Sequence, residues 1–344
     1  MITLPRRVVL ALAASLAATA LAACSTGSTQ AQNTPEAQTK ADPDAFPVTL
    51  DHAYGETTIE EEPTRVATLG WSDHDMAASL GVAPVGAVEI TWGGNEQKST
   101  PWFDEQLEEL GAEQPVRYSD ADGAPVEEIA RLRPDLILAT NSGITEQEYA
   151  RLSKLAPVVA FPDQPWVTTW QESLDMVAQS LGRSGLADEV ATETQASIDT
   201  AAEANPEVVG KTFIFGALAT ADMSKVDYYT PEDNRTRLLA AVGMENAPVI
   251  EQISKSGAFY GTVSAEKAPQ LKSDVFITYA EKKQDLATFE ENPLLGRIPG
   301  IENGNVVAST DKTEALGLSA PSPLAIPYAM EHFVPEVAEA VGGA

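Results

Sequence analysis

The sequence has 344 residues, of which 43% are hydrophobic and 21% are charged, so most of the chain can bury a core as one large domain or two smaller ones. Asp and Glu number 51 against 22 Lys and Arg, a formal charge of −29, which argues against a nucleic-acid partner because no basic excess is left to neutralise phosphates. One Cys and three His without metal-ligand spacing argue against a disulfide framework, a Cys-based metal cluster and a metalloenzyme, and we expect no protein-bound metal and no resident cofactor.

Residues 1–23 are predicted to be an export signal. Arg6 and Arg7 precede an apolar stretch at 8–18, which has the length of a signal sequence rather than of a transmembrane helix. The signal ends in the letters LAAC, and small residues before a Cys resemble the bacterial lipobox. We therefore expect Cys24 to carry a lipid and to begin the mature protein; an ordinary signal peptide with a chance Cys is the alternative.

Residues 24–45 are predicted to be a flexible tether, because they are small and polar, contain Pro and have no apolar period. A lipid anchor followed by a tether would hold a folded body at the extracytoplasmic face of the cell membrane. No later segment has 18 consecutive apolar residues, so we expect no other membrane span.

Short apolar runs alternate with helical patterns from residue 65 onward, which predicts a mainly parallel α/β sheet. Ser72 and Asp75 have the spacing of a capping box at the start of the first helix. The expected strands are 66–69, 84–88, 136–139 and 158–161, and the expected helices are 76–80, 127–132 and 149–155.

The second half of the chain repeats this order, with expected strands at 213–215 and 275–279 and a helix that ends at Gly243. Residues 127–138 align without gaps to residues 266–277, and both segments carry a Glu, a basic residue and an Asp at the same positions. Apolar positions would match in any α/β protein, but the shared Glu is less expected by chance. We infer two lobes of similar topology.

The segment 167–204 between the halves is predicted to be helical almost throughout, with apolar stripes at helical spacing. A helix of 20 residues is about 30 Å long, enough to join two lobes. The predicted fold is therefore α/β, with two Rossmann-like lobes at 46–166 and 205–344 joined by a long backbone helix within 167–204.

With this arrangement of motifs the sequence resembles the binding proteins of iron–siderophore and cobalamin ABC importers, the class III periplasmic binding proteins. The resemblance covers roughly residues 46–344 and rests on motifs that are individually weak but occur in the family's order. They are Pro63-x-Arg65-Val66, Asp75–Gly81, Pro84-Val85-Gly86, the segment from Glu127 to Ile137, Leu155–Val159, Glu266, Asp274 and Pro293-Leu294. Trp71-Ser72-Asp73 and the pair Trp166 and Trp170 favour the iron–siderophore branch.

The resemblance implies a monomer that captures a ferric siderophore between its lobes and delivers it to a membrane permease. It further implies that one Glu on each lobe docks into Arg pockets of the permease, and these fall on Glu127 and Glu266. A carboxylate and an Arg form a bidentate, charge-assisted pair, which suits such docking. The alternative is that each Glu is only an acidic residue in a first helical turn.

Aromatic rings follow several of the predicted strands, and ligands of open α/β sheets bind beyond the carboxyl ends of the strands. We expect these rings to face the cleft, although plain packing is the alternative for any one of them. The predicted ring set is Trp71, Trp92, Trp166, Tyr228, Tyr229, Tyr260 and Tyr279.

A ferric siderophore already fills the coordination sphere of its iron, so the protein needs rings and a few donors rather than metal ligands. Arg is the usual donor, and Arg117 and Arg235 are the favoured candidates, each with a solvated surface role as the alternative. The predicted loops carry few cations and the protein as a whole is acidic. A ligand without negative charge, such as a neutral or cationic hydroxamate complex, therefore fits best. His74 lies near the predicted cleft, although a lone His more often packs or caps.

Three alternatives to this function are an enzyme, a carrier of another cargo and a protein without a transport role. An enzyme is disfavoured because the sequence has no nucleophile elbow, phosphate-binding loop or His–carboxylate cluster. Haem or cobalamin carried by the same fold is the main alternative, and Tyr260 or His74 could serve as an axial ligand to haem. A cell-surface interaction protein without a transport role is the third.

Overall fold

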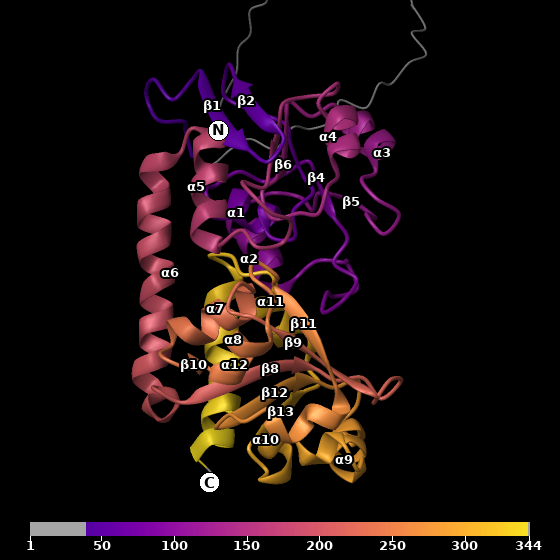
Figure 1. Ribbon diagram of the computed structural model, residues 1–344. Coiled ribbons are helices and arrows are strands. Elements are labelled where there is room, and N and C mark those ends of the chain that lie inside the picture. The colour runs from indigo at the N-terminus through magenta and orange to yellow at the C-terminus, as the bar shows by residue number, and fades with distance from the viewer. Residues whose placement is uncertain (1–38, 343–344) are drawn as a thin grey trace, which may run out of the picture. The chain divides into compact units, whose positions relative to one another are not determined.

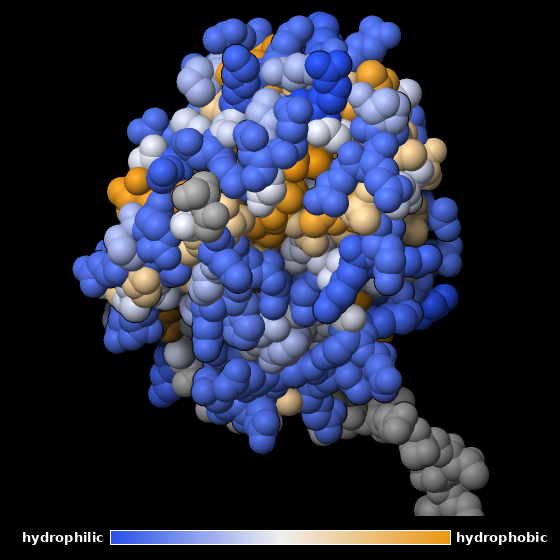
Figure 2. Space-filling view, turned by 90° about the horizontal axis from the view of Figure 1, so that it is seen from below, coloured by the Kyte–Doolittle hydropathy of each residue, from blue (hydrophilic) through white to orange (hydrophobic). Residues whose placement is uncertain are grey.

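The computed structural model describes residues 39–342, which form two α/β lobes and the helices that join them (Figure 1). The predicted export signal, Cys24 and most of the predicted tether lie outside the described residues. The face of the molecule in Figure 2 is mostly hydrophilic, with the largest group of apolar side chains above its centre and others scattered toward the edges.

The first sheet has five parallel strands in the order β5-β4-β3-β6-β7. All residues of β3, β4, β6 and β7 are buried, because helices cover both faces, and this explains their continuous apolar runs. The strands are β3 (Val66–Thr68), β4 (Gly86–Val88), β5 (Val116–Tyr118), β6 (Leu136–Ala139) and β7 (Val158–Ala160). A two-stranded hairpin, which was not predicted, precedes them as β1 (Val48–His52) and β2 (Gly55–Ile59).

The helices of this lobe are α1 (Asp73–Ser79), α2 (Pro101–Glu109), α3 (Val126–Leu132) and α4 (Glu146–Leu152). The capping box predicted for Ser72 and Asp75 is wrong, because Ser72 makes no side-chain cap and the Asp75 carboxylate accepts hydrogen bonds from elsewhere in the protein. A capping box is present instead at Thr145 and Glu148 of α4.

The second sheet is mixed rather than mainly parallel. Its strands follow the order β11-β9-β8-β12-β13, with β10 also paired to β8, and β9 and β11 run antiparallel at one edge. The strands are β8 (Thr212–Ala217), β9 (Lys225–Tyr229), β10 (Glu245–Asn246), β11 (Tyr260–Ser264), β12 (Val275–Tyr279) and β13 (Val306–Ser309).

Helices surround this second sheet and continue to the end of the described chain. The segment at Glu266 is a 3-10 helix, since Pro269 inside it cannot continue an α-helix. The α-helices are α7 (Asn234–Ala241), α8 (Pro248–Ile253), α9 (Gln284–Glu291), α10 (Pro299–Glu302), α11 (Lys312–Ser319) and α12 (Ala325–Gly342), and the 3-10 helices are η1 (Pro206–Val208), η2 (Ala265–Gln270) and η3 (Leu295–Arg297).

The predicted helical segment 167–204 consists of two helices, α5 (Trp170–Leu181) and α6 (Ser184–Ala204). They are separated at Gly182, which adopts a positive φ of 69° and caps α5. Helix α6 has 21 residues and is therefore about 30 Å long. It packs against α5 and against α12, so it forms the predicted backbone helix of the two lobes.

The two lobes share one local arrangement at the Asp of the aligned segments 127–138 and 266–277. The Asp135 carboxylate accepts hydrogen bonds from the backbone nitrogens of Thr64 and Arg65 at 2.9 and 2.7 Å, just before β3. The Asp274 carboxylate likewise accepts bonds from the nitrogen and hydroxyl of Thr212, both at 2.7 Å, at the start of β8. Each duplicated Asp therefore clamps the strand beside its own.

Two predicted boundaries differ from the structure. The tether was predicted to reach residue 45, but Thr39 already bonds to Leu80 and to the buried Arg183, and Asp42 bonds to the backbone at Gly182 and Gly185. These polar contacts hold residues 39–45 against the body. The second lobe was predicted to include all of 205–344, but Leu316, Ala320 and Ala325 pack in the core of the first lobe.

Candidate functional site

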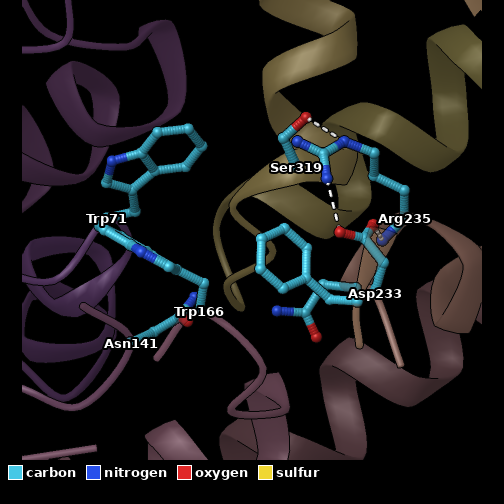
Figure 3. A pocket seen from close by; sticks show the side chains of 8 residues that line it. Trp71, Asn141, Trp166, Asp233, Arg235 and Ser319 are labelled. Carbon is cyan, nitrogen blue, oxygen red and sulfur yellow. Dashed lines mark hydrogen bonds and ion pairs between the residues drawn. The ribbon is translucent and has the colours of Figure 1, made fainter. Parts of the chain in front are cut away.

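A cavity of about 230 Å³ lies where the carboxyl end of the first sheet meets the second lobe. Trp71 follows β3 and Asn141 follows β6, so the first lobe contributes the side chains that the strand-end rule predicts. Figure 3 shows the two indoles facing Arg235, Asp233 and Ser319 across the cavity. Its lining residues are Trp71, Asn141, Trp166, Asp233, Asn234, Arg235, Phe259 and Ser319.

Trp71 and Trp166 form the aromatic wall of this cavity. Their ring centroids are 5.6 Å apart with the planes at 61°, and Trp71 is 38% exposed although its ring is large and apolar. Trp166 has a φ of 68°, a conformation that costs energy for a bulky residue and persists only where the surrounding structure enforces it. Gly143 permits this placement, because a Cβ there would lie 2.6 Å from the Trp166 ring.

Arg235 is held by a network from several elements of the second lobe. Its Nη1 lies 2.7 Å from the Asp233 carboxylate, and its Nε donates to the Tyr279 hydroxyl at 2.8 Å and to Ser319 at 3.0 Å. Its guanidinium carbon lies 4.0 Å from the centre of the Tyr229 ring, a cation–π contact. The guanidinium is thus fixed in one orientation at the edge of the cavity.

The electrostatics of this network follow from burial and charge. Burial disfavours the charged guanidinium, but Tyr279 and Asp233 outweigh it and hold the pKa of Arg235 above its usual range. Burial raises the pKa of Asp233, although Arg235 opposes the shift. Burial raises the pKa of Tyr229 to about 12. Arg235 is therefore charged and Tyr229 is a neutral phenol at physiological pH.

Two smaller cavities share walls with the first. One, of about 130 Å³, is lined by Trp71, Trp92, Glu89 and Asp120 among others. The second, of about 90 Å³, is lined by Trp166, Asp120 and Glu148 among others. Because Trp71 and Trp166 each line two of the three cavities, we treat them as one site, which we call the cleft.

The lobes touch on both sides of the cleft. The ring centroids of Trp92 and Tyr279 are 5.4 Å apart, and the Thr313 hydroxyl donates to the Gly93 carbonyl at 2.9 Å. On the other side the Asn234 side-chain nitrogen donates to the Thr168 carbonyl at 3.1 Å. The structure thus brings Trp71, Trp92, Trp166 and Arg235 to the cleft, with Tyr229 and Tyr279 behind Arg235.

Five predicted ligand residues do not line the cleft: Tyr229 and Tyr279 lie behind Arg235, and the other three lie elsewhere. Tyr228 is 2% exposed and its hydroxyl donates to the Ile253 carbonyl, because successive residues of β9 point to opposite faces and Tyr229 takes the other one. Tyr260 is 55% exposed and contacts Phe259, the ring that does line the cavity. Arg117 lies inside the first lobe, where it donates to Val88 and Ser99.

His74 is also not a cleft residue. It is 1% exposed, packs edge-to-face on Phe103 at 4.8 Å and lies 3.4 Å from the Asp75 carboxylate. Burial, helped by Arg117, lowers the pKa of His74 to about 3, so the ring is neutral. The packing alternative therefore holds for His74. Across residues 39–342 no three His, Cys, Asp or Glu side chains gather closely enough to hold a metal ion.

Several cleft residues were not predicted. Asn141 lies two residues after the expected strand 136–139, so the strand-end rule could have found it. Asp233 was missed, although its position just before α7 is a typical N-cap, and its carboxylate accepts from the Arg235 nitrogen at 2.9 Å. Asn234 and Ser319 had no signal in the sequence, because α7 and α11 bring them to the cleft from distant segments.

Glu127 and Glu266 are both exposed, each in the first turn of its helix, α3 in the first lobe and η2 in the second.

In the described part of the chain, none of the helices is both long and apolar enough to cross a membrane.

The fold and the two-sided cleft agree with a comparison of sequences: the chain belongs to the periplasmic binding protein family, whose model matches residues 66–313. This family consists of substrate-binding transport proteins, not enzymes.

Among solved structures, PiaA from Streptococcus pneumoniae TIGR4 in complex with ferrichrome is 34% identical, with a TM-score of 0.81 over 86% of this chain and 99% of that one. The ferric enterobactin-binding periplasmic protein FepB of Escherichia coli O6:H1 is 22% identical over 78% of this chain and 85% of FepB. The ferric-anguibactin-binding protein FatB of Vibrio anguillarum is 29% identical, but the match spans only 44% of this chain and 46% of FatB.

Proposed function

We propose that this protein is the extracytoplasmic substrate-binding component of an ABC importer and that it captures a ferric siderophore in the cleft. The observation that carries the proposal is the composition of the cleft: two indoles from the first lobe and Phe259 from the second line one cavity, together with one fixed guanidinium and two amide side chains. Rings and neutral donors recognise the organic shell of a chelate, whose iron is already coordinated.

The relatives support this cargo. PiaA, at 34% identity, has been solved with ferrichrome, and FepB and FatB are named for ferric siderophores. The haem alternative has less support, since His74 is buried beneath Phe103 and Tyr260 does not line the cleft.

Delivery would use the exposed faces of both lobes. Glu127 and Glu266 are exposed on α3 and η2, where carboxylates are free to meet Arg side chains of a permease. An anchor at Cys24 would keep the binding protein near that permease and would place it on the outer face of the cell membrane.

Titration of the purified protein with ferric siderophores tests the cargo, because Trp71, Trp92 and Trp166 line the cleft and report binding through their fluorescence. We expect saturable quenching with a midpoint below micromolar for at least one ferric hydroxamate, and much weaker quenching by the same chelator without iron. If no ferric hydroxamate, catecholate or citrate complex quenches the emission, the proposed cargo is wrong. A Soret band after mixing with haemin would then assign the haem alternative.

A further inference from the structure

The charged side chains of the cleft indicate which ferric siderophores the protein can bind. We propose that the cleft selects ferric complexes without net negative charge, the tris-hydroxamate class, and that Asp233 sets this selection by neutralising Arg235. This inference rests on the proposed function and names the chemistry of its ligand. Its evidence is the set of charged side chains that line the three cavities.

The main cavity has one cation, and that cation is already paired. Among the residues that line the cleft, Arg235 is the sole Lys or Arg, and the Asp233 carboxylate lies 2.7 Å from its Nη1. Asp233 is 3% exposed, so its charge is poorly screened by water. Seen from the cavity, the two side chains form a nearly neutral pair rather than a cationic anchor.

The adjoining cavities add further negative charge. Glu89 and Asp120 line the cavity beside Trp92, and Asp120 and Glu148 line the cavity beside Trp166. Glu89 is partly compensated by the exposed Lys98, while Glu148 accepts backbone hydrogen bonds from Ala124 and Thr145. Counted over the lining residues, the cleft carries four carboxylates and one guanidinium.

The charge of a ferric chelate depends on its donor groups. Three hydroxamates each carry one negative charge and cancel Fe(III), so their complex is neutral, or cationic when the chelator also bears an ammonium group. Three catecholates each carry two negative charges and leave a complex with three. A cleft with excess carboxylates repels the second kind, and a fully paired Arg235 offers it little compensation. The paired Arg235 can still donate hydrogen bonds to the ligand, and the aromatic rings of the cleft can still pack against it. An uncharged chelate requires these two kinds of contact.

Replacing Asp233 with Asn tests the role of this residue. The side chains have the same shape, and Asn also caps helices well, so α7 should keep its start while Arg235 loses its counter-charge. Dissociation constants would be measured by Trp quenching for ferrichrome, for ferrioxamine B and for ferric enterobactin. In the unchanged protein we expect the two hydroxamates to bind at least 100-fold more tightly than the catecholate. In Asp233→Asn we expect this ratio to shrink at least tenfold.

Asp188→Asn is the matched control, because it changes the net charge equally at an exposed position on α6. It should leave the ratio unchanged. Asp120→Asn is a second variant, which keeps the test valid if Asp233→Asn does not fold, and it should shrink the ratio about threefold. Thermal unfolding of each variant verifies the fold.

The outcomes separate the two proposals. Equal or tighter binding of ferric enterobactin by the unchanged protein overturns the selection but leaves siderophore capture standing. Failure of every ferric complex to bind overturns the proposed function itself. A preference for hydroxamates that persists unaltered in folded Asp233→Asn and Asp120→Asn shows that these carboxylates do not set it.

Discussion

The Ser322 hydroxyl donates a hydrogen bond of 2.7 Å to Asp75, a residue 247 positions earlier in the chain. The bond ties α1 of the first lobe to the segment that leads into α12, and Trp102 donates to the same carboxylate oxygen at 2.9 Å. Asp75 is 2% exposed, and burial raises its pKa to about 7. A carboxyl group that serves as a structural link is therefore close to titration at neutral pH.

We expect Asp75→Asn to change how stability depends on pH. The folded protein keeps the Asp75 proton up to about pH 7, whereas the unfolded chain releases it near pH 4, so Asp75 makes the free energy of unfolding fall as pH rises between these values. His74 acts in the opposite sense, because its lowered pKa makes the unfolded chain bind the extra proton. Between pH 5 and pH 7, the unfolding free energy of Asp75→Asn should rise by about 2 kcal/mol relative to the unchanged protein.

Urea unfolding at pH 5, 6 and 7 measures this difference. Asp73 and His74 remain in both proteins, so their contributions to the pH dependence cancel in the comparison. Asp188→Asn, an exposed position with the same change of charge, should follow the unchanged protein. Parallel curves for Asp75→Asn would show that the buried carboxyl does not titrate in this range.

The duplicated Asp residues should each stabilise their own sheet. Asp274→Ala removes two hydrogen bonds at 2.7 Å from Thr212, and we expect it to lower the unfolding free energy by about 1–2 kcal/mol. Those hydrogen bonds also lower the pKa of Asp274, so the loss should shrink as the pH falls below about 4. Asp135→Ala should cost a similar amount, and chemical denaturation checks both. A control substitution at exposed Asp188 should change stability by less than about 0.5 kcal/mol.

Trp71 should contribute strongly to ligand affinity, because it lines two of the cavities and is partly exposed before the ligand arrives. We expect Trp71→Ala to raise the dissociation constant for a ferric hydroxamate about 30-fold, corresponding to about 2 kcal/mol. Isothermal titration calorimetry measures this without depending on Trp emission. Trp170→Phe, in the core at the start of α5, is the matched control and should bind normally. Equal affinities of the two variants would remove Trp71 from the site.

The docking proposal predicts that transport and binding can be separated. Glu127→Ala combined with Glu266→Ala should leave the affinity for the ferric siderophore nearly intact, because neither residue lines the cleft. Uptake of radioactive iron by cells that carry the double variant should be lost, since the charge-assisted pairs with the permease are absent. Glu128→Ala, the exposed neighbour on α3, should support normal uptake. Uptake that persists in the double variant contradicts docking by these residues.

Much of the fold was predictable because local patterns and packing agree. Strands covered on both faces read as continuous apolar runs, which is why 136–139 was predicted with its observed bounds. Helix α2 also carries a local signal, since Thr100 caps it and Pro101 occupies its first turn. The antiparallel edge of the second sheet was missed, because short strands such as β9 and β11 look the same in either direction.

The site was harder to predict than the fold, because a residue's type does not say which way its side chain points. Tyr228 and Tyr229 are neighbours of the same type, yet only the strand's register decides which one faces Arg235. The direction of the Arg117 side chain was equally unpredictable. Its strand lies at the edge of the sheet, but its guanidinium turns inward and donates to Val88 and Ser99. Partners from distant segments, such as Ser319, become visible only when α11 is placed.

The packing of Leu316, Ala320 and Ala325 into the first lobe has a practical consequence for dissecting the molecule. Truncation after the backbone helix would leave an amino-terminal fragment with a cavity in its core, where these three side chains pack in the whole protein. The carboxy-terminal fragment would expose the same apolar side chains to water. We expect neither fragment to fold stably when expressed alone, because the two lobes form one cooperative folding unit.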